Sequence, residues 1–240
     1  LTRADYKIKV TNEDNNTGLE SAAFEAIAVV NDLITLRAVP AGVKVKFAGV
    51  ATVTYARTSR NQKYIQDATA AILIDDPNPA VITGTYNIGD GITNIVGKNS
   101  LYNDLIEFVP VSGGEPATGI AIVPEVRTLE SLTPADQCKL VKIENFAFKT
   151  PTQFDVNGKV PTTAKNFDVE GFDNTLMQFR TGFTEADYMG GYVPVGPIAT
   201  IALVGQFKTT MQITSRFWAD MTIPTSIAVT SPVGGESYVQ

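Results

Sequence analysis

The stretch VKVKFAGVATVTY at residues 43–55 decides the fold that the sequence predicts. Apolar and polar side chains alternate along most of it, which is the period-2 pattern of a half-buried β-strand. Gly49 lies in the middle of the stretch and has no Cβ, so the strand can bend or bulge there. A long strand that bends at a glycine is what a small, tightly curved barrel needs.

Four further strands are expected in the first half of the chain, at residues 63–67, 70–75, 92–97 and 101–109. The first two form a hairpin around Ala68-Thr69, and the last two are joined by a turn through Asn99-Ser100. The polar, proline-rich residues 76–79 separate the two pairs. Upstream, Asn31-Asp32 is an N-cap candidate for a single helical turn. Five short strands with a break between the third and the fourth follow the order of an OB-type barrel.

The second half of the chain repeats this order. Its strands are expected at residues 139–148, 166–170, 176–180, 198–205 and 207–214. Both halves also contain an apolar strand that reaches a glycine, Ile95-Val-Gly97 in the first and Leu203-Val-Gly205 in the second. A recurrence at roughly 100 residues indicates duplication of one five-stranded unit. The sequence therefore predicts an all-β protein built from two tandem OB-like, five-stranded Greek-key barrels.

This pattern divides the chain into four parts. Residues 1–30 form an N-terminal segment with a strand and a polar loop, and its alanine-rich end is compatible with a strand or a short helix. The first barrel is expected to span residues 31–124 and the second residues 125–222, with the boundary near Pro124. Residues 223–240 are expected to be a linker and the first strand of a following domain.

Histidine is absent from the 240 residues, and Cys138 is the single cysteine. These two facts exclude Ser-His-Asp and Cys-His nucleophile systems, histidine-ligated zinc and an intramolecular disulfide. Carboxylate pairs remain available, but the acidic residues follow no recognisable catalytic motif, and no glycine-rich phosphate loop is present. The chain is therefore expected not to be an enzyme. Cys138 precedes an apolar strand and is expected to be a buried thiol.

The charge of the chain bears on its partners. The formal net charge is −6, and a protein that held nucleic acid through its phosphates would need a basic surface. This balance argues against a general nucleic-acid binder, although it leaves room for a local basic groove. No apolar run approaches the roughly 20 residues that span a bilayer, so membrane insertion is not expected.

One cluster combines basic and aromatic side chains around the first hairpin of the first predicted barrel. Its members are Tyr55, Arg57, Arg60, Lys63, Tyr64 and Gln66. OB folds hold oligonucleotides and oligosaccharides across their second and third strands, where aromatic stacking and positive charge secure single strands. The cluster is therefore a candidate site for a glycan or single-stranded nucleic acid. The alternative is a solvated hairpin loop with one exposed tyrosine.

Two acidic stretches are candidate Ca²⁺ sites, since calcium takes six to eight oxygen ligands from flexible loops. The first is the alternating set Asn12, Asp14 and Asn16, which Gly18 follows but which lacks the bidentate glutamate of an EF-hand loop. The second is Asp75-Asp76, with Asp67 across the hairpin. The alternative for the first set is a solvated polar loop without a metal. The alternative for the second set is that these residues form a turn.

Aromatic side chains are numerous in the second half, at Phe167, Phe172, Phe179, Phe183 and Tyr188. Aromatics at alternating strand positions more often form a core than a binding platform, so these are expected to be buried. Trp218, near the end of the last strand, is expected to plug a barrel or to cover the junction between the two barrels.

Several motifs in this order resemble a known group of proteins. They are KYIQDATAAILID at residues 63–75, GDGITNIVGKNSLYNDLIEFVP at 89–110, TLESL at 128–132, LVKIENFAF at 140–148 and IALVGQFKTTMQITSR at 201–216. Together they resemble the tandem OB-like domains of unknown function in secreted, multidomain cell-surface proteins of Bacteroidota. The stretch IAVTSPVGGESY at 227–238 is similar to the opening strand of the Ig-like repeats of microbial surface proteins.

The resemblance implies a secreted or cell-surface location and a modular role, without catalytic residues to transfer. We therefore expect a non-catalytic structural or ligand-binding module, whose partners are adjoining domains of the same polypeptide or components of the cell surface. The alternative is an accessory domain that binds single-stranded nucleic acid or glycan for an attached extracellular hydrolase, such as a nuclease.

Overall fold

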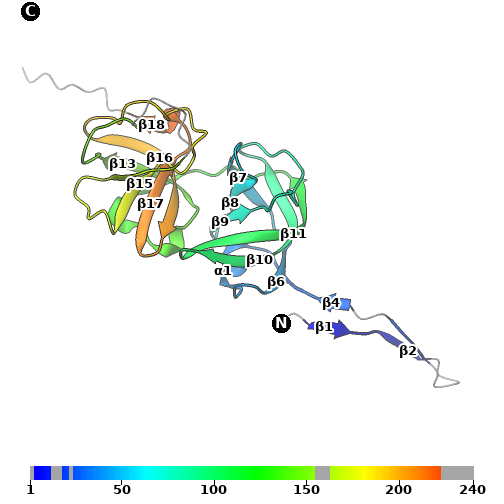
Figure 1. The fold of residues 1–240 in the computed structure, drawn as a ribbon. Helices are drawn as coiled ribbons and strands as arrows, with labels where there is room; N and C mark the ends of the chain where they lie inside the picture. Colours follow the sequence, from blue (N-terminus) through cyan, green and yellow to red (C-terminus); the bar gives the residue numbers. More distant parts are fainter. Residues whose placement is uncertain (1–2, 12–17, 22–23, 155–162, 223–240) are drawn as a thin grey trace, which may run out of the picture.

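The chain folds almost entirely into β-structure, as a closed five-stranded barrel and a second sheet beside it (Figure 1). The computed structural model describes residues 3–11, 18–21, 24–154 and 163–222. The predicted all-β fold class is confirmed.

The first barrel has the predicted strands, with boundaries that differ by a few residues. They are β6 (Lys44–Phe47), β7 (Ala51–Ala56), β8 (Gln62–Gln66), β9 (Ala71–Asp75), β10 (Gly91–Tyr102) and β11 (Leu105–Ala117). The sheet closes in the order β7-β8-β9-β11-β10-β7, and β9 runs parallel to β11. The first strand thus pairs with the second and the fourth, while the third pairs with the fifth, which is the order of an OB-type barrel.

The predicted long strand at residues 43–55 is divided in two at its glycine. Both parts, β6 and β7, pair with β10, so together they act as one strand that bends around the barrel. A Cβ at Gly49 would collide with the carbonyl oxygen of Asn31 and press on the Phe47 ring. Glycine is therefore required at the bend because another backbone segment lies too close for any side chain.

We expect Gly49→Ala to lower the free energy of unfolding by about 2 kcal/mol, since the backbone at Asn31 must move to admit the methyl group. Urea denaturation followed by circular dichroism measures this change. The matched control is Gly182→Ala, where the nearest atom, Thr214 Oγ1, lies 3.7 Å from the added Cβ. Equal stability of the two variants would contradict the proposed close approach.

The predicted turn through Asn99-Ser100 is wrong. Strand β10 continues to Tyr102, and the chain turns at Asn103 and Asp104, whose φ angles are 48° and 69°. Asn and Asp tolerate this left-handed conformation better than other residues with a side chain. Asn99 is instead buried, and its Nδ2 donates to the carbonyl oxygens of Leu36 (2.7 Å) and Val39 (2.8 Å). The Asn99 amide therefore satisfies carbonyl groups at the end of the helix at residues 33–38, and Asn99 does not form a turn.

The second sheet has the same strand order as the first barrel. Its strands are β12 (Glu125–Arg127), β13 (Leu140–Phe146), β14 (Asn166–Asp168), β15 (Met177–Arg180), β16 (Ile198–Phe207), β17 (Thr210–Ser215) and β18 (Met221–Thr222). The order along the sheet is β13-β16-β17-β15-β14, with β15 parallel to β17. Phe148, just after β13, bridges Val169, just after β14, and so links the two ends of this order.

The aromatic residues of the second half form the core of this sheet, as predicted. Phe167, Phe179, Phe183 and Tyr188 are all buried, and Phe172 is partly buried against them. Trp218 begins a short 3₁₀ turn, η3 (Trp218–Asp220), and remains 40% exposed. It therefore does not plug a barrel.

Each sheet is preceded by the same local arrangement. Strand β5 (Ala28–Val30) pairs parallel to β6, and a short helix α1 (Leu33–Ala38) joins them. Strand β12 likewise pairs parallel to β13, and the first turn after it is η1 (Leu129–Ser131). The predicted N-cap is confirmed, since the Asp32 side chain accepts from the Thr35 N–H at 2.8 Å.

The N-terminal segment projects away from the first barrel as a narrow ribbon (Figure 1). In it β1 (Arg3–Tyr6) pairs with β4 (Phe24–Ala26), and β2 (Lys9–Thr11) pairs with β3 (Gly18–Glu20). The alanine-rich end, for which a strand and a helix were both considered, is therefore a strand where it is described. The predicted calcium loop with Asn12, Asp14 and Asn16 lies outside the described residues.

Candidate ligand-binding site

The predicted basic and aromatic cluster lies where the two barrels meet. Tyr55 is only 4% exposed, and its ring centroid lies 4.5 Å from that of Phe183 and 5.7 Å from that of Phe217, both in the second barrel. The Tyr64 ring packs edge-on against Phe183 at 5.5 Å. Gln66 accepts a hydrogen bond from the Leu140 N–H at 2.8 Å. These three side chains join the barrels and are not stacking platforms open to solvent.

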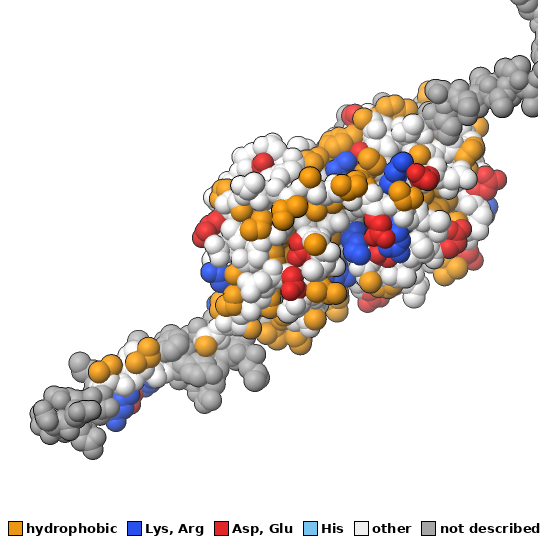
Figure 2. All heavy atoms as spheres, turned by 180° about the vertical axis from the view of Figure 1, so that it is seen from behind, with side chains coloured by type: hydrophobic (Ala, Val, Ile, Leu, Met, Phe, Trp, Pro, Cys, Tyr) orange, Lys and Arg blue, Asp and Glu red, His pale blue; other side chains and the backbone are white. Residues whose placement is uncertain are grey.

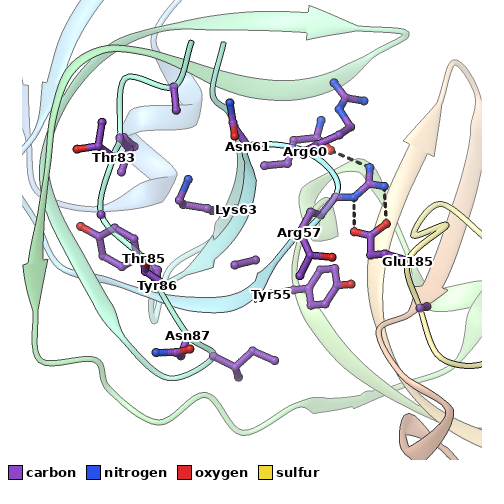
Figure 3. A pocket seen from close by; sticks show the side chains of 18 of the residues that line it. Tyr55, Arg57, Arg60, Asn61, Lys63, Thr83, Thr85, Tyr86, Asn87 and Glu185 are labelled. Atoms are coloured by element: carbon purple, nitrogen blue, oxygen red, sulfur yellow. Dashed lines mark hydrogen bonds and ion pairs between the residues drawn. The ribbon is translucent and has the colours of Figure 1, made fainter. Parts of the chain in front are cut away.

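Arg57 makes a bidentate contact between the barrels. Its Nε and Nη2 each donate to a carboxylate oxygen of Glu185, both at 2.9 Å (Figure 3). The Ser59 hydroxyl donates to the same carboxylate at 2.9 Å. Although burial raises the pKa of Glu185, the hydrogen bonds and charge of Arg57 outweigh it and hold that pKa below its usual value. Such a bidentate pair fixes orientation as well as distance.

Two further arginines reach across the junction. Arg216 is paired with Asp220 through two bonds of 2.9 Å, and its Nη1 donates to the Thr54 carbonyl of the first barrel at 2.9 Å. Arg37 donates to the Pro134 carbonyl at 3.0 Å and to Gln137 Oε1 at 3.1 Å. The junction is therefore built from oriented polar contacts around the aromatic cluster.

Gln137 and Cys138 complete the contact. Gln137 Nε2 donates to the Asp104 carbonyl at 2.8 Å and to Gln206 Oε1 at 2.7 Å. The expected burial of Cys138 is confirmed, since it is 0% exposed and packs with Ala71 and Leu73. Burial raises the pKa of this thiol to about 12, so it stays protonated at neutral pH.

The remaining two cluster residues differ in exposure. Lys63 is 8% exposed, and its ammonium lies 3.7 Å from Asp76 Oδ2. Burial lowers the pKa of Lys63, while Asp76 opposes that change. The Arg60 side chain is 57% exposed and lies 3.3 Å from Asp75. Of the three cations among the six predicted binding residues, Arg60 has the most exposed side chain.

The acidic pair at Asp75 and Asp76 serves the local structure. Asp75 Oδ1 accepts from Gln62 Nε2 at 2.7 Å, and Asp76 accepts from the N–H groups of Val81 (2.7 Å) and Ile82 (3.0 Å). Asp67, also considered as a calcium ligand, accepts from the Leu33 N–H at 2.7 Å. Over the described ranges, no group of three or more Asp, Glu, Cys or His side chains is placed to hold a metal ion.

Two hollows flank the Arg57–Glu185 pair. The first, here called the loop pocket, has a volume of about 910 Å³ and lies between residues 56–63, residues 80–88 and residues 185–187. Lys63 points into it (Figure 3). Two of its polar side chains have partners within the protein: the Tyr86 hydroxyl donates to the Gly114 carbonyl at 2.7 Å, and Lys63 is paired with Asp76.

The second hollow, here called the inter-barrel groove, has a volume of about 720 Å³. One wall is formed by β8, β9 and the start of β11, and the other by β15, β16 and β17. Charged side chains of both signs gather near the middle of one face, between the two barrels (Figure 2). Both volumes fall in the range of roughly 300–1,000 Å³ found for small-molecule sites.

A buried carboxylate marks the inter-barrel groove. Glu107 on β11 lines it and is 7% exposed. Burial raises the pKa of Glu107 to about 7, and the nearby Asp75 adds to the rise, while Arg60 opposes it. Sequence reasoning missed Glu107, Glu185 and Gln137. A local pattern does not indicate them, because Arg57 and Glu185 are 128 positions apart.

The comparisons with known proteins add no identification. No protein-family model matches the chain, and no curated protein matches it. Within the described segments, no helix has the length and apolar character needed to cross a membrane. Fold and site therefore define this chain as an all-β protein with OB-like barrel topology and two hollows beside the junction of its two sheets.

Proposed function

We propose that the chain is a non-catalytic module of a secreted, cell-surface multidomain protein, in which two OB-like barrels act as one rigid unit. This proposal rests on one observation: the side chains of the basic and aromatic cluster contact the second barrel. Tyr55 and Tyr64 pack against Phe183 of the second barrel, and Arg57 is paired with Glu185. A bidentate, largely buried ion pair at such a junction suits a structural role, because it fixes relative orientation.

We infer that the two barrels arose by duplication of one unit. The shared strand order supports this, and so does the shared arrangement in front of each barrel. The buried pair Leu33 and Leu36 in NDLITL (31–36) corresponds to the buried pair Leu129 and Leu132 in RTLESL (127–132). The repeated unit then includes the parallel strand and the helical turn, which the strand pattern alone did not reveal.

The proposal of a non-catalytic role rests on composition. The chain has no histidine, and its cysteine is buried and protonated. The extracellular location rests on the resemblance to secreted Bacteroidota domains. Adjoining domains of the same polypeptide or cell-surface components are the proposed partners.

The second candidate function is an accessory domain that binds glycan or single-stranded nucleic acid for an attached hydrolase. The inter-barrel groove favours it, because OB folds hold such ligands across the second and third strands, here β8 and β9. Nucleic acid fits less well than glycan. Arg57 and Lys63 are already neutralised by Glu185 and Asp76, which leaves few free cations for phosphates.

A double-mutant cycle tests the rigid junction. We expect Arg57→Ala and Glu185→Ala to show a coupling of about 2 kcal/mol in urea denaturation, because the pair is desolvated and bidentate. The matched control is the exposed pair Lys142 and Glu144 at 3.0 Å, where we expect a coupling of about 0–0.5 kcal/mol.

Residual dipolar couplings supply the second measurement. If the barrels form one rigid unit, a single alignment tensor fits the amides of residues 44–117, 140–154 and 163–215 in the unaltered chain. We expect a single tensor in the Arg57→Ala, Glu185→Ala double variant as well, because Arg216, Arg37 and Gln137 still join the barrels. Separate tensors in the unaltered chain would refute the rigid module.

A further inference from the structure

The inter-barrel groove is a composite of both barrels and is framed at two places. Arg57, which is paired with Glu185, lies on its lining. Elsewhere along the groove, the tips of the two equivalent hairpins meet, where the Lys208 N–H donates to the Asn103 carbonyl at 2.7 Å. Tyr102 and Phe207, the neighbours of these two residues, both line the groove. Its shape therefore depends on both barrels being held in place.

Glu107 supplies a hydrogen-bond acceptor without a protein donor inside this groove. Its side chain accepts no hydrogen bond from any residue that the structure describes, although it is only 7% exposed. Its oxygens are not among the fully buried polar atoms that lack a partner, so solvent reaches the carboxylate, and a ligand hydroxyl that donates to it takes the place of water. The loop pocket offers no comparable group, because Lys63 and Tyr86 already have partners.

The rest of the lining combines aromatic surface with balanced charge. Tyr102 is 61% exposed and Phe207 is 43% exposed, and the Lys208 ammonium lies 5.8 Å from the centroid of the Phe207 ring. Arg57, Arg60 and Arg180 line the groove together with Asp75 and Glu107, and Arg57 is paired with Glu185 outside the lining. The lining therefore offers flat apolar surfaces and both donors and acceptors.

We propose that the inter-barrel groove binds a neutral oligosaccharide, with a sugar hydroxyl donating to Glu107 and sugar rings lying on Tyr102 and Phe207. This inference deepens the proposed function as a non-catalytic module and rests on it. A sugar presents hydroxyl donors and apolar C–H faces, which match these two kinds of lining. A phosphate backbone would meet Asp75 and Glu107, whose charge repels it.

Isothermal titration calorimetry tests the assignment with cellopentaose, laminaripentaose, xylopentaose, maltopentaose and mannopentaose as neutral probes, and oligo-dT as an anionic probe. We expect at least one neutral probe to bind and oligo-dT not to bind. Glu107→Gln and Tyr102→Ala should each raise Kd by about tenfold or more, since one loses the charged acceptor and the other a stacking surface. The control is Tyr192→Ala, an aromatic that is 74% exposed and outside the groove lining.

Several results would overturn the proposal. They are no binding of any neutral probe, preference for oligo-dT, or binding that neither Glu107→Gln nor Tyr102→Ala weakens. Circular dichroism melts of each variant separate lost binding from lost folding, and Phe207→Ala provides a third variant on the opposite wall. Hydrolysis of a bound probe would refute the non-catalytic role and leave the site standing, whereas separate alignment tensors would refute the rigid module alone.

Discussion

Replacing Arg216 with methionine is expected to lower the free energy of unfolding by about 3–5 kcal/mol. Arg216 and Asp220 are 9% and 8% exposed and are joined by two hydrogen bonds of 2.9 Å. Removal of the guanidinium leaves the Asp220 carboxylate buried without its cation, and it also removes a donor from the Thr54 carbonyl. An uncompensated buried charge costs more than the net contribution of the intact pair.

Urea denaturation at neutral pH measures this effect, with two comparison variants. Arg60→Met removes an arginine whose side chain is 57% exposed, and it should change stability by less than about 0.5 kcal/mol. Arg216→Met combined with Asp220→Leu removes both charges, and it should recover much of the loss. A change below about 1 kcal/mol in the single Arg216 variant would show that this contact does not hold the barrels together.

Glu107→Gln is expected to make the protein more stable at pH 8 and to leave its stability nearly unchanged at pH 4. Burial in the folded state raises the pKa of Glu107 to about 7 from its ordinary value of 4.5. Below about pH 4.5 the carboxyl group is protonated in both states, and its contribution to stability is fully present. As pH rises through this window, the unfolded chain loses the proton first, and the folded protein becomes less stable by on the order of 3 kcal/mol.

The measurement is the difference in unfolding free energy between Glu107→Gln and the unaltered chain, from urea titrations at pH 4, 5.5, 7 and 8. The difference cancels the contributions of the other titrating groups. Glu144→Gln on β13 is the control, since the Glu144 side chain is 58% exposed and we expect no comparable trend. A difference that stays constant with pH would mean that Glu107 is not desolvated in the groove.

These two predictions concern different aspects of the same junction. The Arg216 variant tests how firmly the barrels are joined. The Glu107 variant tests how strongly the groove desolvates the Glu107 carboxylate. A carboxylate that destabilises the fold at neutral pH, and that faces a hollow, is more readily explained by binding than by stability. The pH titration of Glu107→Gln is therefore an independent check on the electrostatics of the proposed oligosaccharide site.

The local features of the fold could be predicted because each depends on neighbours in the chain. Alternation along residues 43–55 marks a half-buried strand, and Gly49 marks its bend. The Asp32 cap uses an N–H three residues away. The prediction of a turn at Asn99-Ser100 was wrong because two polar pairs, Asn99-Ser100 and Asn103-Asp104, follow each other closely. Only the burial of Asn99 in the folded structure distinguishes the two pairs.

The candidate site, in contrast, depends on contacts between residues far apart in the sequence. The sequence by itself determined two sets of strands in OB-type order, the absence of histidine chemistry, and a group of basic and aromatic side chains around Tyr55 and Tyr64. Only the tertiary structure decided what that group contacts. The same composition suits a nucleic-acid groove or a domain junction, and the partner that distinguishes them, Glu185, is 128 positions from Arg57. The groove exists because two barrels pack at an angle fixed by such distant pairs, which no local pattern contains.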